Sequence, residues 1–170
     1  MVMGEQFDYA VPESFNLGSY YLDVNLEEGR GDKTAILQDD KSYSFLDLWR
    51  LTNRVGNVLR QVGVTPGDRV LLILEDSPEW MASWIATMKV GGVGTHAYTY
   101  LPRDDYEYLF DLVEPRVEVT DAMTIGRLRA ALAGREDGMT VLVAGVDGAE
   151  LHDGEVALDE LIAAAPNQLE

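Results

Sequence analysis

The feature that most constrains the fold is a continuous apolar run, Arg69-Val70-Leu71-Leu72-Ile73-Leu74, which stands between two segments of helical periodicity. A strand with one solvated face alternates apolar and polar residues, whereas a strand covered on both faces is apolar throughout. The run therefore predicts a strand buried on both faces, which is typical of a parallel sheet covered by helices.

The segments on both sides of this strand predict amphipathic helices. Ser44, with Asp47 three residues later, resembles a capping box, and Gly63 stands where the first helix should end. Asp76-Ser77-Pro78-Glu79 offers a cap residue, a first-turn proline and a first-turn acid for the second helix, which Gly91-Gly92 closes. The apolar positions at helical spacing are Leu48, Leu51, Val55, Val58, Leu59 and Val62 in the first helix, and Trp80, Met81, Trp84, Ile85 and Met88 in the second.

The alternation of strands and helices continues to the end of the chain. Periodicity predicts further strands over 93–99, 116–120 and 140–144, and further helices over 103–113, 125–133 and 156–165. This order predicts an α/β fold with a doubly wound, mostly parallel sheet and helices on both faces. The loops expected on the surface are 134–138 and 145–154, which are rich in Gly and Asp.

A short β-hairpin is expected before the first helix. Residues 34–37 and 41–43 are strand-like and flank the polar pair Asp39-Asp40. Residues 1–31 have no regular period and are interpreted as a lead-in segment with one short helix near 17–24. Residues 32–170 are interpreted as one α/β unit.

Charge and composition exclude several classes of function. Thirteen Lys and Arg against thirty Asp and Glu give a net charge of -17, which repels nucleic acid and anionic membranes. The chain has no cysteine, which rules out disulfides and thiolate metal sites, and no apolar stretch approaches the roughly 18 residues of a membrane span. We expect a cytoplasmic protein without nucleic-acid or membrane partners.

Several motifs are more specific than an α/β pattern requires. Ser44-Phe45-Leu46-Asp47-Leu48 and Val64-Thr65-Pro66-Gly67-Asp68-Arg69-Val70 resemble the Thr-Tyr-x-Glu-Leu and Gly-Val-x-Pro-Gly-Asp-Arg-Val pair of adenylate-forming enzymes. Asp76-Ser77-Pro78-Glu79-Trp80 resembles that family's Asn-Ser-x-Glu-Phe, and Lys89-Val90-Gly91-Gly92-Val93 its Lys-Ala-Gly-Ala-Val. Arg103-Asp104-Asp105-Tyr106-Glu107-Tyr108-Leu109 resembles the Pro-Asp-Asp-Tyr-x-Tyr-Met stretch of benzoate-CoA ligases. The resemblance covers roughly residues 14–165.

The resemblance implies the N-terminal portion of an AMP-forming acyl-CoA synthetase, closest to the benzoate/aryl-CoA ligase branch. In that family a carboxylate attacks the α-phosphate of ATP, and the CoA thiol then displaces AMP, so the intact enzyme is expected to use ATP, Mg²⁺ and CoA. The family's phosphate-binding loop, ribose-binding Asp and catalytic Lys have no counterpart in this sequence, which stops near where the phosphate loop would begin. We therefore expect the isolated chain to hold no cofactor and to be inactive.

Two hypotheses of different class follow. The first is a scaffold portion of an aryl- or acyl-CoA ligase, present as a recombinant fragment, a truncated gene product or one half of a split enzyme. Its partners would be the remaining ligase domains or a complementary chain. The second is a stand-alone binding or regulatory module that pairs with itself or with a ligase. Both predict an uncovered apolar face and hence a homodimer. A third, weaker option is a nucleotide-binding protein in its own right.

The candidate binding residues are Tyr98, Tyr100 and Arg103, near CoA or substrate in an intact enzyme. Tyr98 and Tyr100, with Tyr106 and Tyr108, are expected to cluster around one loop at the carboxyl ends of the strands, where open α/β sheets bind ligands. Some CoA ligases place an arginine that reaches the CoA nucleotide in this loop. The position that aligns with it here holds Tyr100, and Arg103 follows three residues later.

Other conspicuous residues have structural interpretations. Gly92-Val93-Gly94 follows a helix rather than a strand, so helix termination explains it better than dinucleotide binding. His96, on a strand expected to be buried, and His152, in a loop, lack a second His or a Cys nearby, so no metal site is expected. Asp39-Asp40 and Asp104-Asp105 stand at a turn and a helix start, where carboxylates satisfy free N–H groups. Helical spacing assigns Trp80, Trp84 and Met88 to core packing, and no residue is assigned as catalytic.

Overall fold

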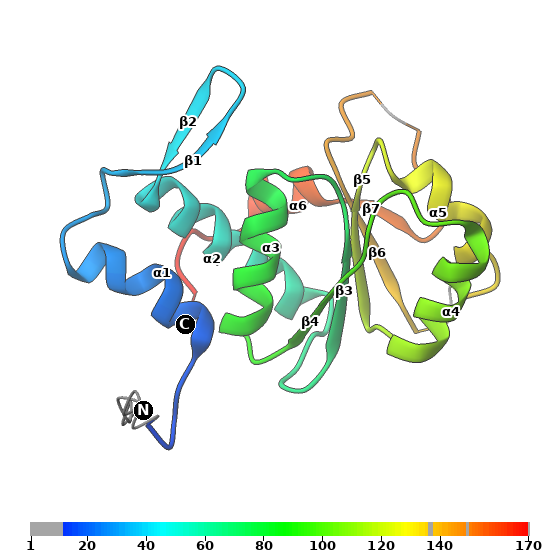
Figure 1. Ribbon diagram of the computed structural model, residues 1–170, viewed down its shortest axis with the longest axis horizontal. Helices are drawn as coiled ribbons and strands as arrows, with labels where there is room; N and C mark the ends of the chain where they lie inside the picture. The colour runs from blue at the N-terminus through cyan, green and yellow to red at the C-terminus, as the bar shows by residue number, and fades with distance from the viewer. Residues whose placement is uncertain (1–11, 136–137, 149, 170) are drawn as a thin grey trace, which may run out of the picture.

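A computed structural model describes residues 12–135, 138–148 and 150–169, and within these ranges the chain forms a five-stranded sheet and a separate two-stranded hairpin (Figure 1). The sheet order is β4-β3-β5-β6-β7, and every neighbouring pair runs parallel. Its strands are β3 (Arg69–Ile73), β4 (Val93–His96), β5 (Val117–Asp121), β6 (Thr140–Ala144) and β7 (Glu155–Ala157). The hairpin pairs β1 (Thr34–Gln38) with β2 (Lys41–Ser44) antiparallel.

Helices cover both faces of the parallel sheet, as the sequence predicts. Figure 1 shows α2 (Phe45–Gln61), α3 (Pro78–Lys89) and α6 (Leu158–Ala164) on one face, and α4 (Arg103–Val113) and α5 (Ile125–Leu132) on the other. The helix α1 (Leu17–Glu27) packs on α3 and α2. The chain runs from β3 outward to β4 and then returns to β5 on the other side of β3, so the winding direction reverses between β3 and β5.

The apolar run in β3 is buried on both faces, which explains its composition. Val70 and Leu72 belong to the core cluster shared with α2 and α3, whereas Leu71 and Ile73 belong to the cluster under α4 and α5. All four side chains are fully buried. Burying a side chain of this size contributes roughly 1.5–3 kcal/mol, so β3 is the central element of both cores.

The starts of α2 and α3 predicted from the sequence are confirmed. The Ser44 Oγ accepts a hydrogen bond from the Asp47 N–H at 3.1 Å, and the Asp47 carboxylate accepts one from the Ser44 N–H at 3.0 Å, which completes the capping box. The hydrogen bonds from Ser44 lower the pKa of Asp47. At α3, the Ser77 Oγ accepts from the Trp80 N–H at 3.0 Å.

Three sequence expectations are corrected. The strand β4 ends at His96 instead of 99, and it lies at the edge of the sheet, so His96 is exposed and not on a buried strand. The helix expected from residue 156 begins at Leu158, because 155–157 pair with β6 as β7. A strand this short shows no periodicity that could reveal it.

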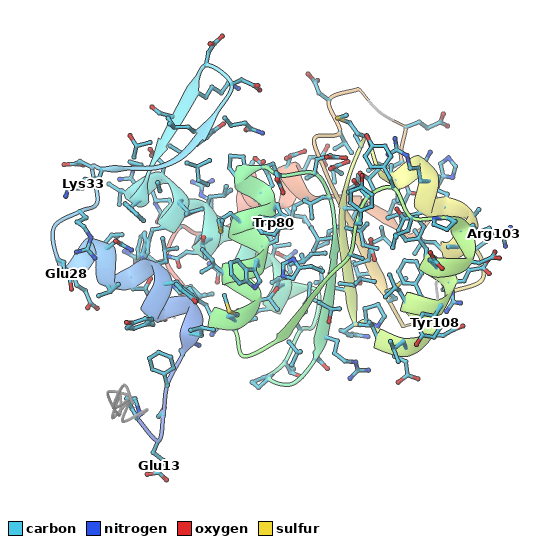
Figure 2. All side chains as sticks on the ribbon, viewed as in Figure 1. Glu13, Glu28, Lys33, Trp80, Arg103 and Tyr108 are labelled. Carbon is cyan, nitrogen blue, oxygen red and sulfur yellow. The ribbon has the colours of Figure 1, made fainter. Side chains whose placement is uncertain are left out.

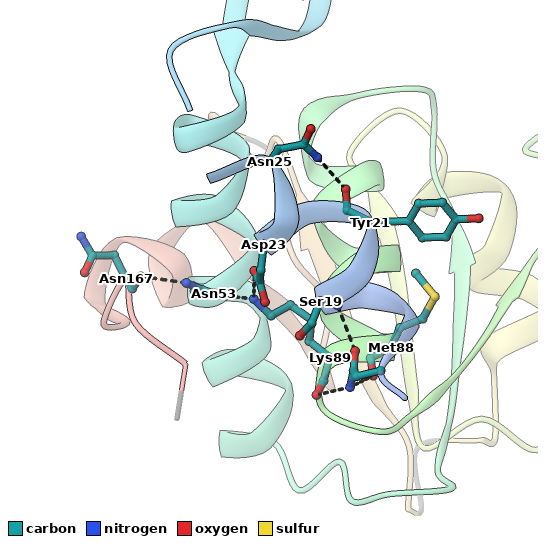
Figure 3. Close-up of polar contacts among 9 residues, drawn as sticks. Ser19, Tyr21, Asp23, Asn25, Asn53, Met88, Lys89 and Asn167 are labelled. Atoms are coloured by element: carbon teal, nitrogen blue, oxygen red, sulfur yellow. Dashed lines mark hydrogen bonds and ion pairs between the residues drawn. The ribbon is translucent and has the colours of Figure 1, made fainter. Parts of the chain in front are cut away.

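A lysine with a mostly buried side chain joins α1, α2 and α3. The Lys89 Nζ donates to Asp23 Oδ1 at 2.7 Å and to Asn53 Oδ1 at 3.0 Å (Figure 3). Asn53 in turn donates from Nδ2 to the Asn167 carbonyl at 3.1 Å, which attaches the C-terminal segment to α2. These polar groups satisfy one another, and the network joins the three helices.

Candidate functional site

The carboxyl ends of β3, β5 and β6 meet at one edge of the sheet, where a pocket of about 290 Å³ opens. In open α/β sheets, ligands bind outside these strand ends at the point where the winding reverses. The acidic residues that line the pocket are Glu75, Asp76, Glu79, Asp121 and Asp159. This edge is therefore the place where the topology favours a ligand, and carboxylates dominate its charge.

Two of these carboxylates are occupied by backbone N–H groups. Asp121 Oδ2 accepts from the Glu75 N–H at 2.6 Å, which ties the ends of β3 and β5 together. Asp121 Oδ1 accepts from the N–H groups of Met123 at 3.0 Å and Thr124 at 2.7 Å, at the start of α5. Asp159 accepts from the Gly145 N–H at 2.7 Å in the same way. These acids stabilise the strand-end loops, and their N–H partners are not free for phosphate oxygens.

The residues at this edge do not fit a triphosphate. Phosphate sites use free backbone N–H groups, helix N-termini and cationic side chains. The lining has five acidic residues, and none of its members is Lys or Arg. Among the residues that the structure describes, no group of three or more His, Cys, Asp or Glu could hold a metal ion.

The tyrosine loop after β4 lies beside this edge. The rings of Tyr98 and Tyr100 have centroids 5.5 Å apart, and both side chains are more than half exposed. The guanidinium of Arg127, on α5, lies 4.2 Å from the Tyr100 ring centroid, a cation–π contact. Thr99, between the two tyrosines, donates to Glu75 Oε1 at 2.8 Å and anchors the loop to the end of β3.

Tyr106, on α4, holds the same loop through its hydroxyl group. Its hydroxyl donates to the Tyr98 carbonyl and accepts from the Leu101 N–H, each at 3.1 Å. Its side chain is fully buried, and burial raises the pKa of this phenol. Tyr106 is thus a positioning residue for the loop, a role that a buried, satisfied phenol performs well.

The structure brings some of the predicted site residues together and separates others. Tyr98, Tyr100 and Tyr106 meet at the loop, whereas Arg103 and Tyr108 are exposed on α4 (Figure 2). Arg103 forms an i,i+4 ion pair with Glu107 at 2.6 Å. The cation at the loop is Arg127, which lies far along the sequence on another helix. A role of Tyr98, Tyr100 or Arg103 near CoA or substrate stays a prediction.

The remaining sequence candidates are placed as follows. Gly92 precedes β4, which agrees with helix termination. Trp80, Trp84 and Met88 are only partly buried against the core, and the rings of Trp80 and Trp84 contact His96 at centroid distances of 5.4 and 5.7 Å. Although His96 is exposed at the sheet edge, its partial desolvation lowers the pKa of the imidazole. The further positions are Asp39, in the hairpin turn with a φ of 50°, Asp104 and Asp105, in the first turn of α4, and His152, in the loop before β7.

The sequence interpretation missed one buried acid. Glu118 lies in the middle of β5, is fully buried, and neither carboxylate oxygen has a hydrogen-bond partner in the described structure. Burial raises the pKa of Glu118 well above the ordinary carboxyl value, because the apolar surroundings favour the neutral form of the acid. A glutamate between Val117 and Val119 matches the alternation of a half-exposed strand, so no sequence signal marks it as buried.

In the described part of the chain, no helix combines the length and the apolar character that a membrane crossing requires.

Comparison with known proteins gives one consistent result. The AMP-binding enzyme family matches residues 24–168. The 3-hydroxybenzoate–CoA/4-hydroxybenzoate–CoA ligase of Thauera aromatica is 30% identical over 92% of this chain and 32% of its own length, and the benzoate–CoA ligase of the same organism is 32% identical over 94% and 29%. The chain thus spans about a third of the length of these relatives.

Solved structures agree with these relatives. The anthranilate CoA ligase AuaEII, in complex with anthranoyl-AMP, superposes with a TM-score of 0.82 at 28% identity over 94% of this chain and 30% of its own. A benzoate CoA ligase from Burkholderia xenovorans LB400 superposes with a TM-score of 0.76 at 26% identity over 90% of this chain and 29% of its own. Because the family matches residues 24–168 of this chain and the α/β fold is shared with the solved structures, the chain belongs to the AMP-binding enzyme family.

Proposed function

We propose that this chain is the N-terminal section of an AMP-forming CoA ligase for benzoate-like acids. The observation that carries the proposal is the family match over residues 24–168, together with relatives that are named as benzoate and hydroxybenzoate ligases. In the complete enzyme, ATP supplies the adenylyl group and CoA the thiol. The role proposed for this chain is to build the first sheet and the loops at its carboxyl edge.

We also propose that the 170 residues do not perform the adenylation by themselves. The carboxyl edge supports this, because its acidic residues repel the triphosphate and Asp121 and Asp159 engage nearby backbone N–H groups. Charge that develops on phosphorus in the transition state needs fixed cationic or N–H donors. In the proposed enzyme these donors come from the two thirds of the ligase that the relatives have and this chain does not span.

Complementation tests the proposal. The chain is mixed with the benzoate–CoA ligase of Thauera aromatica from which the matching N-terminal third has been removed, and pyrophosphate release is followed with benzoate, ATP, Mg²⁺ and CoA. We expect neither part to release pyrophosphate alone and the mixture to do so in a benzoate-dependent manner. If the separate parts assemble poorly, the two parts are fused in one chain, and the fused chain is expected to release pyrophosphate.

A matched control addresses folding. Leu72→Asp places a charge in the core shared with α2 and α3 and should abolish the complementation, because Leu72 is fully buried on β3. Pyrophosphate release by the unmixed chain, or heat on titrating it with ATP, would contradict the proposal. Failure of the fused chain despite a folded N-terminal section would contradict it as well.

A further inference from the structure

Three stretches of this strongly acidic chain contain no charged residue and lie together in the fold. Residues 90–102 form the longest stretch of the sequence without Asp, Glu, Lys or Arg, and residues 14–22 and 80–88 are also uncharged. In the fold these stretches supply β4, the outer face of α3 and the start of α1, which lie side by side (Figure 1). Separate parts of the sequence therefore converge on one uncharged face in a chain of net charge -17.

This face carries a continuous row of aromatic rings, which we call the aromatic edge. Ring centroids are 5.2 Å apart for Phe15 and Tyr20, 6.2 Å for Tyr20 and Tyr21, 6.2 Å for Tyr21 and Trp84, 5.9 Å for Trp84 and Trp80, and 5.4 Å for Trp80 and His96. Phe15, Tyr20 and Tyr21 are 46%, 58% and 52% exposed. Exposed apolar surface of this continuity usually marks an interaction site.

The strand beside these rings has an open edge without the usual protection. Within the described residues β4 pairs with β3 alone, and Val93 is 51% exposed. Edge strands are commonly guarded by Lys, Pro or a bulge, and Val93-Gly94-Thr95-His96 contains none of these residues. The N–H groups of Val93 and Ala97 bond to carbonyls of Asp68 and Leu72, so by alternation the backbone groups of Gly94 and His96 point away from β3.

We propose that two copies of this chain associate through β4, which pairs antiparallel with the same strand of the second copy and brings the two aromatic edges together. A twofold axis at Thr95 pairs Gly94 with the partner's His96 and His96 with the partner's Gly94. Both pairs then exchange the outward N–H and C=O groups, as hydrogen-bonded pairs do in an antiparallel ladder. Thr95 faces the partner's Thr95 across a non-hydrogen-bonded position.

Charge favours a second copy as the occupant of this face. Two chains of net charge -17 repel each other on most approaches, and the uncharged face is where they meet without opposing carboxylates. A strongly basic partner, by contrast, would be attracted to the acidic surfaces elsewhere on the chain rather than to these uncharged stretches. Association is therefore expected to strengthen with salt, because screening reduces the repulsion between the remaining surfaces while the apolar contact persists.

Cross-linking tests the register. The chain has no cysteine, so Thr95→Cys introduces a single thiol. Cβ atoms of directly opposed residues in an antiparallel pair are about 4.5–5.5 Å apart, close to the separation that a disulfide spans. We expect rapid oxidation of Thr95→Cys to a covalent dimer, and slow oxidation of the control Leu37→Cys, although Leu37 on the hairpin is 78% exposed. Equal rates for the two variants would overturn the proposed register.

Sedimentation tests the interface without oxidation. Val93→Lys places a charge on the open edge and should weaken the dimer at least about tenfold, whereas Leu112→Lys, at a 63% exposed position on α4, should leave it unchanged. Circular dichroism and the unfolding temperature verify that both variants fold. A wild-type chain that stays monomeric at high concentration and high salt overturns the proposal. The proposal is also overturned if hydrogen exchange at β4 slows only when the complementary ligase part is added, because that part, and not a second copy, then covers the aromatic edge.

Discussion

At the scale of single residues, Glu118 is a fully buried acid in the sheet. Its neighbours Val117 and Val119 point into the core under α2 and α3, so alternation points Glu118 to the side covered by α4 and α5. That side is apolar around Leu71 and Ile73, and the carboxyl group is without a partner in the described structure. This environment favours the neutral form of the acid over the charged form.

Glu118 therefore makes the stability depend on pH. Because its folded-state pKa is raised above the unfolded value, the folded chain keeps a proton that the unfolded chain loses. The contribution of Glu118 to stability is greatest below the ordinary carboxyl pKa and falls as pH rises from there toward the raised folded-state pKa. We expect Glu118→Gln to gain stability relative to wild type as pH rises from about 4 to about 8, as measured by urea unfolding.

Two further variants sharpen this measurement. Glu118→Leu also removes the unsatisfied oxygens and should stabilise the chain by about 1–3 kcal/mol at neutral pH. Glu27→Gln, at an exposed position on α1, is the control for removing a carboxylate from the surface. A difference between Glu118→Gln and wild type that does not change with pH would show that the acid is not held neutral.

At the scale of elements, local pattern predicts most of the fold. The expected bounds of α4, 103–113, and of β6, 140–144, match the structure, and β3 was predicted from its apolar run alone. These elements carry their own periodicity, caps and glycines, so their identity does not depend on distant residues. Tyr98 and Tyr100 lie in one loop after β4, as expected, although the strand was expected to continue to residue 99 and ends at His96.

What the sequence could not predict depends on pairing order and long-range contacts. The place of β4 at the sheet edge, which exposes His96, follows from which strands become neighbours, and local pattern contains no information on this. The cation–π contact of Arg127 with Tyr100 joins α5 to the loop after β4. The ion pair of Lys89 with Asp23 joins α3 to α1. Such contacts become visible only when the chain is folded.

The packing of α1 on α3 depends on a close approach at Gly18. A Cβ built there lies 2.7 Å from the Ile85 carbonyl oxygen and 3.0 Å from the Lys89 backbone nitrogen, which are backbone atoms that cannot turn aside. Gly18→Ala should therefore push α1 away and loosen the bond between Lys89 and Asp23. We expect a loss of about 1–3 kcal/mol, measured as a lower midpoint in urea unfolding.

Gly126 is the matched control for Gly18. It also lies within a helix, α5, but a Cβ there meets no atom within 4 Å. Gly126→Ala should stabilise the chain by about 0.5–1 kcal/mol, because alanine loses less conformational entropy in a helix. If Gly18→Ala lowers the free energy of unfolding and Gly126→Ala raises it, the close contact, and not helix propensity, determines the result at Gly18. If both substitutions raise the free energy of unfolding, the tight packing of α1 is contradicted.

At the scale of the whole molecule, excess negative charge opposes the compact state. A net charge of -17 in 170 residues is concentrated further by folding, which brings acids such as Glu75, Asp121 and Asp159 to one edge. This self-repulsion acts over a Debye length of about 30 Å at 0.01 M salt and about 10 Å at 0.1 M. Screening should therefore favour the folded chain over the unfolded one.

We expect the unfolding temperature to rise as ionic strength increases from about 0.01 M to about 0.2 M. Each kcal/mol of relieved repulsion corresponds to a rise of roughly 2–4 °C in a chain of this length. The unfolding temperature is measured by calorimetry at low protein concentration, with Val93→Lys as a control that weakens association. If screening alone is responsible, the unfolding temperature of this variant should rise with salt as much as that of wild type. Sodium chloride and sodium perchlorate at equal ionic strength should act alike in this range. An unfolding temperature that is constant or falls with salt would mean that attractive ion pairs, such as that of Arg129 with Glu155 at 2.9 Å, outweigh the repulsion.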